Sequence, residues 1–387
     1  MVNRCVRVGV CLGTSWVVGR EVLRGVYAVG APLDWTVSPV DTEDLPRVAA
    51  WTPDVLIVND LSWDDIRGHL RDDQVVVGVE VELPPGRARS ATARLDNRAI
   101  GSAAAGHLVA CGLHTLAGFG YAGHTWWDDR FEGFRAVAGA AGCAVDRCEV
   151  VPTSRPRTGA VPCRAFDQIQ PWLRSLPRPA GVFAGCDAWG RTVVEEATAA
   201  GLRVPEDVAV IAADNDDLFC ALTRPELTSV IIPWNALGMV AARLAHDLLQ
   251  GRAPVAPPPL EPPGVAVRRS SEVLAVRDPD VAAALGVIRA HRGKRCGVRD
   301  VLRQVPAGRH RLERGFRREL GRTMTEEIRR IHVDEAKRLL ATTDLLLADV
   351  AARSGFANAN KMGIAFRKET AQSPSEYRAR FRVTAAP

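Results

Sequence analysis

A proline-rich segment divides the sequence into two parts with different patterns. Residues 251–264 (GRAPVAPPPLEPPG) contain six prolines and almost no periodic apolar pattern. Because proline lacks a backbone N–H and fixes φ, this segment is expected to be an extended connection. Regular helical patterning resumes near Asp280. The sequence therefore predicts two regions, residues 1–275 and 276–387.

In the first region, short apolar runs alternate with helix-length amphipathic segments. This alternation predicts an α/β fold with parallel sheets covered on both faces, and about seven strands over 275 residues favour two doubly wound lobes. Such folds bind ligands at the carboxyl ends of their strands and between lobes. The runs expected to be strands are Cys5–Leu12, Asp54–Asn59, Val75–Val79, Leu116–Tyr121, Gly181–Cys186, Val208–Ala213 and Ser229–Ile232.

The second region shows only helical patterns, with a short helix, a tight turn and a second helix occurring twice. A longer amphipathic helix, about Thr325–Ala341, joins the two units. The first unit's second helix buries Leu312, Phe316 and Leu320, which are spaced by four residues. The second unit is centred on Met362 and Phe366. These patterns predict an all-α domain with a tandem pair of helix-turn-helix units.

The faces opposite these buried stripes are basic and polar. Arginine can pair with guanine in the major groove, asparagine with adenine and isoleucine with a thymine methyl, while other cations contact phosphates. The expected DNA-binding residues are His310, Arg311, Arg314, Arg317 and Arg318 in the first unit, and Asn360, Lys361, Ile364, Arg367 and Lys368 in the second.

The charge is also unevenly distributed. Residues 280–387 hold 23 Lys and Arg against 12 Asp and Glu, a net charge of +11, whereas residues 1–279 carry −6. Sign alone leaves nucleic acid, an anionic membrane surface and an acidic protein as possible partners. No apolar run approaches 18 residues, so no membrane span is expected. The nine cysteines include no CxxC pair, which favours a reduced, cytoplasmic chain without a bound metal.

The C-terminal 100 residues resemble the arabinose-regulator type of DNA-binding domain. The resemblance rests on the phenylalanine-centred first recognition helix, on Ser354-Gly355-Phe356 and on the closing Ser373-Pro374 with Tyr377-Arg378. Three positions depart from that pattern. Gly315 replaces a usual basic residue, Lys361-Met362 replaces a usual aromatic pair, and Ala371 replaces a common glycine.

One motif in the first region indicates a different function. Gly118, Gly120 and Gly123 in GFGYAG have GxGxxG spacing after an expected strand. An NAD-dependent or sugar-acting enzyme built on this region is therefore the alternative hypothesis. We find no catalytic constellation to support it, and no cofactor is expected.

Most of residues 5–250 resemble the ligand domain of lactose-repressor-type regulators. The clearest matching segments are LDNRAIGSAAAGHLVACGLHTLAGFGY and GVFAGCDAWGRTVVEEATAAGLRVPEDVAVIAADNDDL. The resemblance implies that Arg130 and Asp214 bind sugar hydroxyls, that Asp187 lies between the lobes and that Arg20 begins the first helix. Cys186 replaces a frequent asparagine. The expected ligand-binding residues are Trp16, Arg20, Trp126, Trp127, Arg130, Asp187, Trp189, Asp214 and Asn215, since indoles also pack well against sugar rings.

A lactose-repressor-type body followed by an arabinose-type DNA-binding domain is the arrangement of the xylose operon regulator family. The resemblance implies a cytoplasmic transcription regulator of carbohydrate-utilisation genes, with xylose or a related pentose bound between the lobes. It also implies a homodimer on a double-stranded DNA operator, which contacts RNA polymerase if it is an activator.

Overall fold

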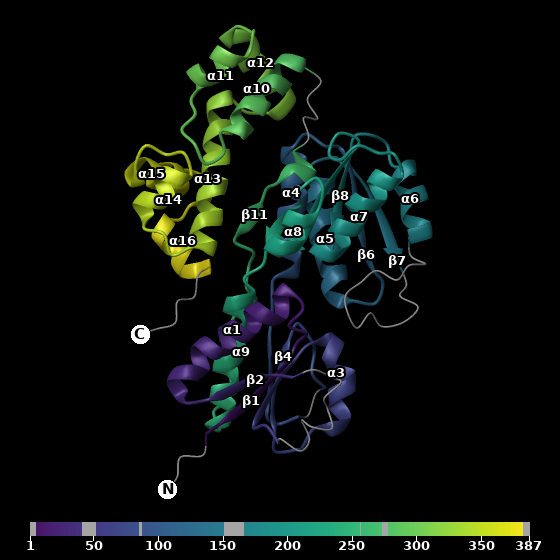
Figure 1. Cartoon of the computed structure of the whole chain (residues 1–387), viewed down its shortest axis with the longest axis vertical. Coiled ribbons are helices and arrows are strands. Elements are labelled where there is room, and N and C mark those ends of the chain that lie inside the picture. The colour runs from purple at the N-terminus through teal and green to yellow at the C-terminus, as the bar shows by residue number, and fades with distance from the viewer. Residues whose placement is uncertain are drawn as a thin grey trace.

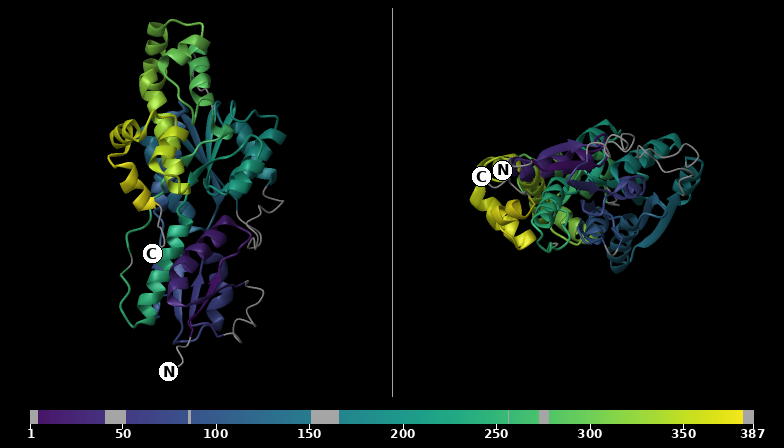
Figure 2. Two further views of the ribbon diagram at one scale, coloured as in Figure 1. Left: turned by 60° about the vertical axis from the view of Figure 1, so that its left-hand side comes forward. Right: turned by 90° about the horizontal axis from the view of Figure 1, so that it is seen from below.

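The computed structural model describes residues 5–40, 52–84, 87–150, 166–255, 257–272 and 278–381. These residues form two α/β lobes and a helical region that lies along one of them and extends beyond it (Figures 1 and 2). The boundary predicted near residue 275 falls outside the described residues.

The first lobe is built on a parallel five-stranded sheet with the order β2-β1-β3-β4-β5. Val8, Val55 and Val75 face the helix pair α1 and α9, whereas Leu56 and Val76 face α3 on the other side. The elements are β1 (Arg7–Cys11), α1 (Val17–Gly30), η1 (Ala31–Leu33), β2 (Thr36–Pro39), β3 (Val55–Val58), α3 (Asp60–Ile66), η3 (Arg67–His69), β4 (Val75–Val79), β5 (Ser90–Ala93) and α9 (Trp234–Leu249).

The second lobe has a six-stranded sheet with the order β11-β10-β9-β8-β6-β7, in which β11 pairs antiparallel with β10. Its elements are α4 (Asn97–Ala110), β6 (Thr115–Tyr121), α5 (Thr125–Ala140), β7 (Ala144–Val150), α6 (Phe166–Ser175), β8 (Ala180–Ala184), α7 (Asp187–Ala199), β9 (Val208–Asp214), α8 (Asp217–Leu222), β10 (Thr228–Ile231), β11 (Gly264–Ala266) and η5 (Arg269–Ser271).

The chain passes between the lobes after β5, after β10 and again after α9. The first and last of these passages are bonded to each other. Leu95 and Leu260 form a parallel bridge, and the Asp96 N–H donates to the Leu260 carbonyl at 2.9 Å. The proline-rich segment therefore returns the chain to the second lobe, where β11 joins the sheet edge.

The C-terminal region is entirely helical among its described residues. It contains two hydrophobic cores, one around Leu312 and Phe316 and the other around Met362 and Phe366. Helix α13 contributes to both and so links the two units. The helices are α10 (Pro279–Ala290), α11 (Val298–Gln304), α12 (Arg309–Leu320), α13 (Met324–Thr342), α14 (Leu347–Arg353), α15 (Ala359–Thr370) and α16 (Pro374–Phe381).

This architecture confirms the predicted α/β body followed by an all-α region. The estimate of about seven strands was wrong, because the described chain forms eleven. The four strands outside the seven predicted apolar runs, β2, β5, β7 and β11, lack a continuous apolar run. β7, for example, reads AVDRCEV and is largely half-buried or exposed.

Candidate ligand cavity and DNA-binding surface

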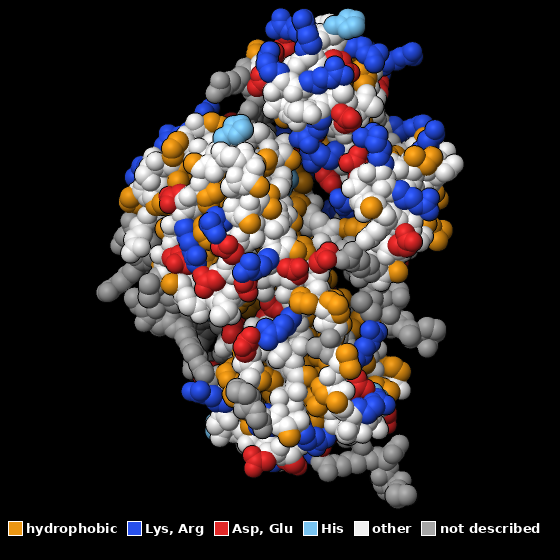
Figure 3. All heavy atoms as spheres, turned by 180° about the vertical axis from the view of Figure 1, so that it is seen from behind, with side chains coloured by type: hydrophobic (Ala, Val, Ile, Leu, Met, Phe, Trp, Pro, Cys, Tyr) orange, Lys and Arg blue, Asp and Glu red, His pale blue; other side chains and the backbone are white. Residues whose placement is uncertain are grey.

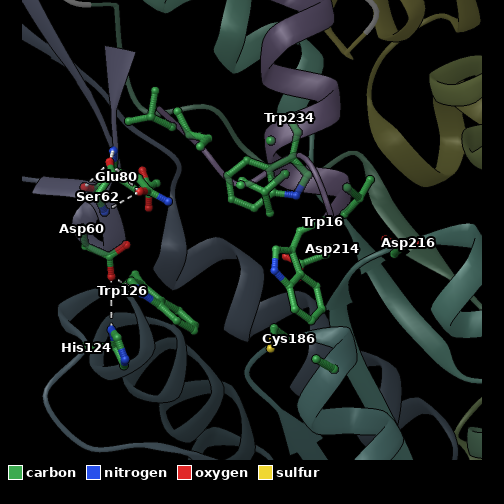
Figure 4. Close-up of a pocket in the computed structure, with 18 of the residues that line it drawn as sticks. Trp16, Asp60, Ser62, Glu80, His124, Trp126, Cys186, Asp214, Asp216 and Trp234 are labelled. Atoms are coloured by element: carbon green, nitrogen blue, oxygen red, sulfur yellow. Dashed lines mark hydrogen bonds and ion pairs between the residues drawn. The ribbon is translucent and has the colours of Figure 1, made fainter. Parts of the chain in front are cut away.

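A cavity of about 540 Å³ lies between the two lobes, at the carboxyl ends of both sheets (Figure 4). The first lobe lines it with residues after β1, β3 and β4, and the second with residues after β6, β8 and β9. Parallel strands end at one edge of a sheet, so residues distant in sequence meet here. Six of the nine predicted ligand residues line the cavity, namely Trp16, Trp126, Arg130, Asp187, Trp189 and Asp214.

Arg130 places a buried positive charge in the wall of this cavity. Its Nε donates to Asn97 Oδ1 at 2.9 Å and its Nη1 to the Gly185 carbonyl at 2.6 Å, with Asp214 Oδ1 4.0 Å from Nη1. The guanidinium also lies 4.8 Å from the centre of the Trp126 ring. Burial lowers the pKa of Arg130, and the carboxylates of Asp214 and Glu80 oppose this effect. These contacts fix the orientation of a planar hydrogen-bond donor.

Two carboxyl groups of the second lobe line the cavity, of which Asp187 is buried and Asp214 half-buried. Asp214 ends β9 with φ at +114°, and Asp187 accepts from Ser229 Oγ at 2.6 Å and from the Asp216 N–H at 2.7 Å. Burial raises the pKa of Asp187 to about 7. Burial, together with the nearby Asp187 charge, also holds the pKa of Asp214 well above its ordinary range. Each shift favours the neutral carboxyl, which can donate as well as accept a hydrogen bond.

Sequence reasoning missed a set of polar residues from the first lobe. Asp60 reaches across the cavity, where its Oδ2 accepts from Trp126 Nε1 at 3.3 Å and lies 3.1 Å from His124 Nδ1 (Figure 4). Glu80 accepts from Asn97 Nδ2 and so supports the partner of Arg130. Asp60 lies two residues after β3, and Glu80 directly follows β4. Their position after expected strands was the signal available in the sequence.

Aromatic rings form much of the remaining lining. Trp16 stacks on Phe219 with ring centres 5.2 Å apart, and Trp126 stacks on Trp189 at 5.3 Å. Trp234, the first residue of α9, adds a fourth indole group (Figure 4). The cavity therefore combines flat apolar faces with hydrogen-bonding groups.

The C-terminal helices carry a second candidate site on their surface. Lys and Arg side chains gather at the end of the molecule that these helices form (Figure 3). On α12, His310, Arg314 and Arg317 are exposed and point away from the Leu312–Phe316 stripe. Arg311 and Arg318 are also exposed but pair with the start of α10. Arg311 Nε lies 2.7 Å from Asp280 Oδ2, and Arg318 Nη2 lies 3.1 Å from Asp278 Oδ2.

The same packing accounts for one departure from the arabinose-regulator pattern. A Cβ at Gly315 would lie 2.3 Å from Val281 Cγ2, because α10 crosses α12 at this point. The basic side chain expected from the family pattern would have to displace α10.

On α15, all five predicted DNA-binding residues are exposed. Ile364 has 59% of its surface accessible. The Asn358 side chain begins this helix by accepting from the Lys361 N–H at 2.9 Å. The residues on its outward surface are Asn360, Lys361, Ile364, Arg367 and Lys368.

Comparisons with known proteins cover both regions. The chain matches the periplasmic binding protein-like domain family over residues 105–271 and a helix-turn-helix domain family over residues 302–380. It is 29% identical to the xylose operon regulatory protein of Escherichia coli over 93% of each chain. The chain is a two-part helix-turn-helix transcription regulator.

Further relatives of the regulator match it in whole or in part. The xylose operon regulatory protein of Haemophilus influenzae is 32% identical over 54% of each chain. A solved structure of a xylose-binding transcription activator aligns over 98% of the regulator and 99% of that chain, with a TM-score of 0.61 and 25% identity. The ribose-bound LacI family regulator of Enterococcus faecium, at 21% identity and a TM-score of 0.56, shares the fold of the ligand domain, covering 68% of the regulator and 98% of that chain.

Three predicted ligand residues of the regulator lie outside the cavity lining. Trp127 is fully buried in the core and its Nε1 donates to Glu149, since it faces inward from α5. The Arg20 guanidinium turns back to the Ser15 carbonyl and pairs with Asp216 at 3.2 Å. Asn215 accepts from Arg268 Nη2 at 2.8 Å, away from the cavity.

The GxGxxG motif of the regulator has a packing explanation. A Cβ at Gly118 would lie 2.5 Å from the Phe131 ring, and one at Gly120 would lie 2.2 Å from the Trp127 ring. Both glycines lie inside β6 and let α5 pack closely against it. In a phosphate-binding loop, these glycines would instead lie between the strand and the helix.

None of the described helices is both long and apolar enough to span a membrane.

Proposed function

We propose that this regulator controls carbohydrate-utilisation genes in response to a neutral monosaccharide, D-xylose or a related pentose, bound between the lobes. The observation that carries the proposal is the cavity itself, which Arg130 and Asp214 line together with the indole groups of four tryptophans. Adjacent sugar hydroxyls suit carboxylate and guanidinium groups, and the apolar faces of a sugar ring suit indoles. The xylose regulators among its relatives support the pentose.

The charge of the lining supports a neutral sugar over a sugar acid or a sugar phosphate. The described lining contains one arginine and no lysine. Arg130 already donates to Asn97 and to the Gly185 carbonyl, and Asp214 lies 4.0 Å away, so few of its N–H groups are free to bind an anion. The lining carboxyl groups are Asp60, Asp65, Glu80, Asp187, Asp214 and Asp216.

The remaining parts of the proposal concern partners and location. The regulator acts in the cytoplasm as a homodimer on double-stranded operator DNA. If it activates transcription, it also contacts RNA polymerase. It acts as a sensor rather than as a catalyst, so the bound sugar is released unchanged, and NMR spectra of D-xylose incubated with the protein test this directly.

A thermal-shift experiment tests the ligand. We expect D-xylose or another neutral pentose to raise the Tm, since ligand at 100 times its Kd stabilises a single-site domain by about 2.7 kcal/mol. D-Xylonate and D-xylose 5-phosphate should give no shift. Asp214→Asn should abolish the response, because it replaces one carboxyl oxygen by an amide NH₂, which cannot accept from a sugar hydroxyl, while keeping a residue that tolerates positive φ.

The matched control is Asp72→Asn, which makes the same change at an exposed position. Asp72 precedes β4 and so lies at the end of the first lobe's sheet that is opposite the cavity. It should leave the sugar response intact. If no neutral sugar shifts the wild-type Tm, or if Asp214→Asn responds like Asp72→Asn, the proposed ligand site is wrong.

A further inference from the structure

The DNA-binding region contacts the second lobe through a half-buried polar contact at the end of α4. Arg322, in the turn before α13, donates from Nη2 to the Ala110 carbonyl at 2.8 Å. Ala110 is the last residue of α4, where backbone carbonyls lack helical partners and the helix dipole favours a cation. Arg322 therefore caps a helix of the ligand domain.

Other charged groups hold Arg322 in place. Its Nε lies 2.8 Å from Glu327 Oε2, and Glu327 is only 1% exposed. Arg330 Nη2 lies 2.8 Å from the other carboxylate oxygen of Glu327, and Arg330 Nη1 lies 3.0 Å from Asp334 Oδ2. We call Arg322, Glu327, Arg330 and Asp334 the α13 latch.

The opposite end of α4 lies at the ligand cavity. Asn97, its first residue, accepts from Arg130 Nε and donates to Glu80. Helix α4 also packs against α5, which carries Arg130, with almost no space between the backbones. A Cβ at Gly101 would lie 1.7 Å from the Arg130 carbonyl oxygen, and one at Gly133 would lie 2.0 Å from the Arg98 carbonyl oxygen. Helices α4 and α5 therefore move as one body.

A second series of hydrogen bonds runs from the ligand cavity to the neighbourhood of the α13 latch. Asp187, in the cavity, accepts from Ser229 Oγ on β10 at 2.6 Å. The neighbouring Thr228 Oγ1 accepts from Ser271 Oγ at 2.7 Å, and Ser271 Oγ lies 2.7 Å from His107 Nε2 on α4. His107 lies beside the α13 latch, in a small gap that Arg330 and Asp334 also line.

We propose that the α13 latch makes the DNA-binding region a rigid extension of the second lobe, and that sugar occupancy reaches the recognition helices through it. This inference rests on the proposed function for its ligand. A sugar that draws the lobes together moves α4 relative to the first lobe, and α12 and α15 move with it. Arg322 is then a positioning residue, which contacts neither sugar nor DNA.

The docking itself can be tested without a ligand. Cys111, which follows α4, is 4% exposed and lines the small gap beside the latch together with Arg289 and Arg330 of the DNA-binding region. Arg322→Met should raise the alkylation rate of Cys111 at least tenfold, as read by peptide mass spectrometry. Cys11 and Cys220, buried elsewhere in the ligand domain, should stay protected and so report that the domain remains folded. An unchanged Cys111 rate would overturn the docking.

The transmission is tested on operator DNA, using a duplex selected from a random pool by the wild-type protein. The measured quantity is the ratio of Kd values with and without D-xylose. We expect this ratio to approach 1 in Arg322→Met. It should recover in Arg322→Lys, because lysine can still donate to the Ala110 carbonyl. The control Arg243→Met changes an exposed position on α9 and should keep the wild-type ratio. Glu327 keeps Arg330 as a partner in these variants, so no buried charge is left alone.

The outcomes separate the two proposals. A wild-type ratio above or below 1 that persists in Arg322→Met would overturn the transmitting role of the latch while leaving the sugar-sensing function standing. A wild-type ratio of 1 with D-xylose, L-arabinose and D-ribose would overturn the proposed function, and the transmitting role with it. The Cys111 rate would then still decide whether the latch docks the two regions.

Discussion

The two recognition helices share one framework and differ in the surface they present. Each position of α12 is matched by the position 50 residues later in α15, so that Phe316 corresponds to Phe366 and Leu312 to Met362. Both helices end in a left-handed residue, and a capping box begins the helix that follows each of them. The shared residues maintain the fold of each unit, which leaves the outward positions free to diverge.

Those outward positions do diverge. His310, Arg314 and Arg317 on α12 correspond to Asn360, Ile364 and Arg367 on α15. The first set suits guanine and phosphate, whereas the second combines an amide and an apolar group that suit adenine and the thymine methyl. We therefore expect the two similar units to contact two different short DNA sequences.

The test with the largest expected effect compares the central residues of the outward surfaces of α12 and α15. Arg314→Ala should weaken operator binding by about 1–3 kcal/mol, which is roughly 5- to 160-fold, and relax specificity at one base pair. Ile364→Ala should cost less, since it removes only an apolar contact. Binding to operator variants with single base-pair changes measures both effects. Equal losses would mean that the two helices do not divide base reading in this way.

The second test exchanges the residues that end the two helices. Gly321 and Ala371 have φ values of +68° and +58°, a conformation that costs alanine about 1–2 kcal/mol relative to glycine. Ala371→Gly should therefore raise the free energy of unfolding of the second unit by about 1 kcal/mol, and Gly321→Ala should lower that of the first by a similar amount. Urea unfolding monitored for each unit by hydrogen exchange gives the values. Changes of the same sign would show that the two turns are not equivalent.

The third test compares two cations at equivalent positions. Arg311 is paired with Asp280, whereas no ion pair to Lys361 occurs among the described residues. Lys361→Gln should reduce the slope of log K against log salt by about 0.9, the value for one phosphate contact. Arg311→Gln should reduce it less, because Asp280 already neutralises part of that charge. Titrations between 50 and 200 mM salt measure both slopes. A larger effect at Arg311 would contradict the comparison.

The smallest expected effect concerns the joint between the two units. His332 on α13 is 5% exposed and packs edge-on against Phe356 of the second unit, with ring centres 5.6 Å apart. Burial lowers the pKa of His332 below its ordinary value near 6.5, although a hydrogen bond with the Lys294 backbone opposes this. The neutral imidazole is therefore favoured in the folded state. Its stabilising contribution is present above about pH 6.5 and is lost as the pH falls.

Urea unfolding from pH 8 to pH 5 measures this loss, with His332→Gln as the control that cannot titrate. The difference in free energy of unfolding between wild type and His332→Gln should shrink as the pH falls. A difference that is constant across this range would assign the pH dependence to other groups.

The sequence predicts most of the framework for physical reasons that are local. Buried stripes such as Leu312 and Phe316 and apolar runs such as Val75–Val79 are visible in single segments. Half-exposed strands such as β7 leave no such signal. Among cavity residues, Asp214 and Arg130 were recognised by resemblance, while Asp60 and Glu80 were missed although each closely follows a strand.

Positions that depend on tertiary contacts could not be predicted from local patterns. Trp127 and Trp126 are adjacent in sequence, yet one is enclosed in the core and the other lines the cavity, because neighbouring helical residues point about 100° apart. Likewise, Arg311 and Arg318 could not be separated from Arg314 without knowing where α10 packs. The pairing of Arg322 with Ala110 joins residues from different domains and has no local signature.

The connection between the ligand domain and the first helix of the DNA-binding region is short. Leu260 and β11 are bonded to the ligand domain, and Ser271 is held by Thr228, only seven residues before Asp278 caps α10. A fully extended chain of that length reaches only about 25 Å. We therefore expect the rotational position of α12 and α15 relative to a bound duplex to be restricted. In a dimer, inserting half a helical turn, about five base pairs, between half-sites would place one half-site on the wrong side of the DNA.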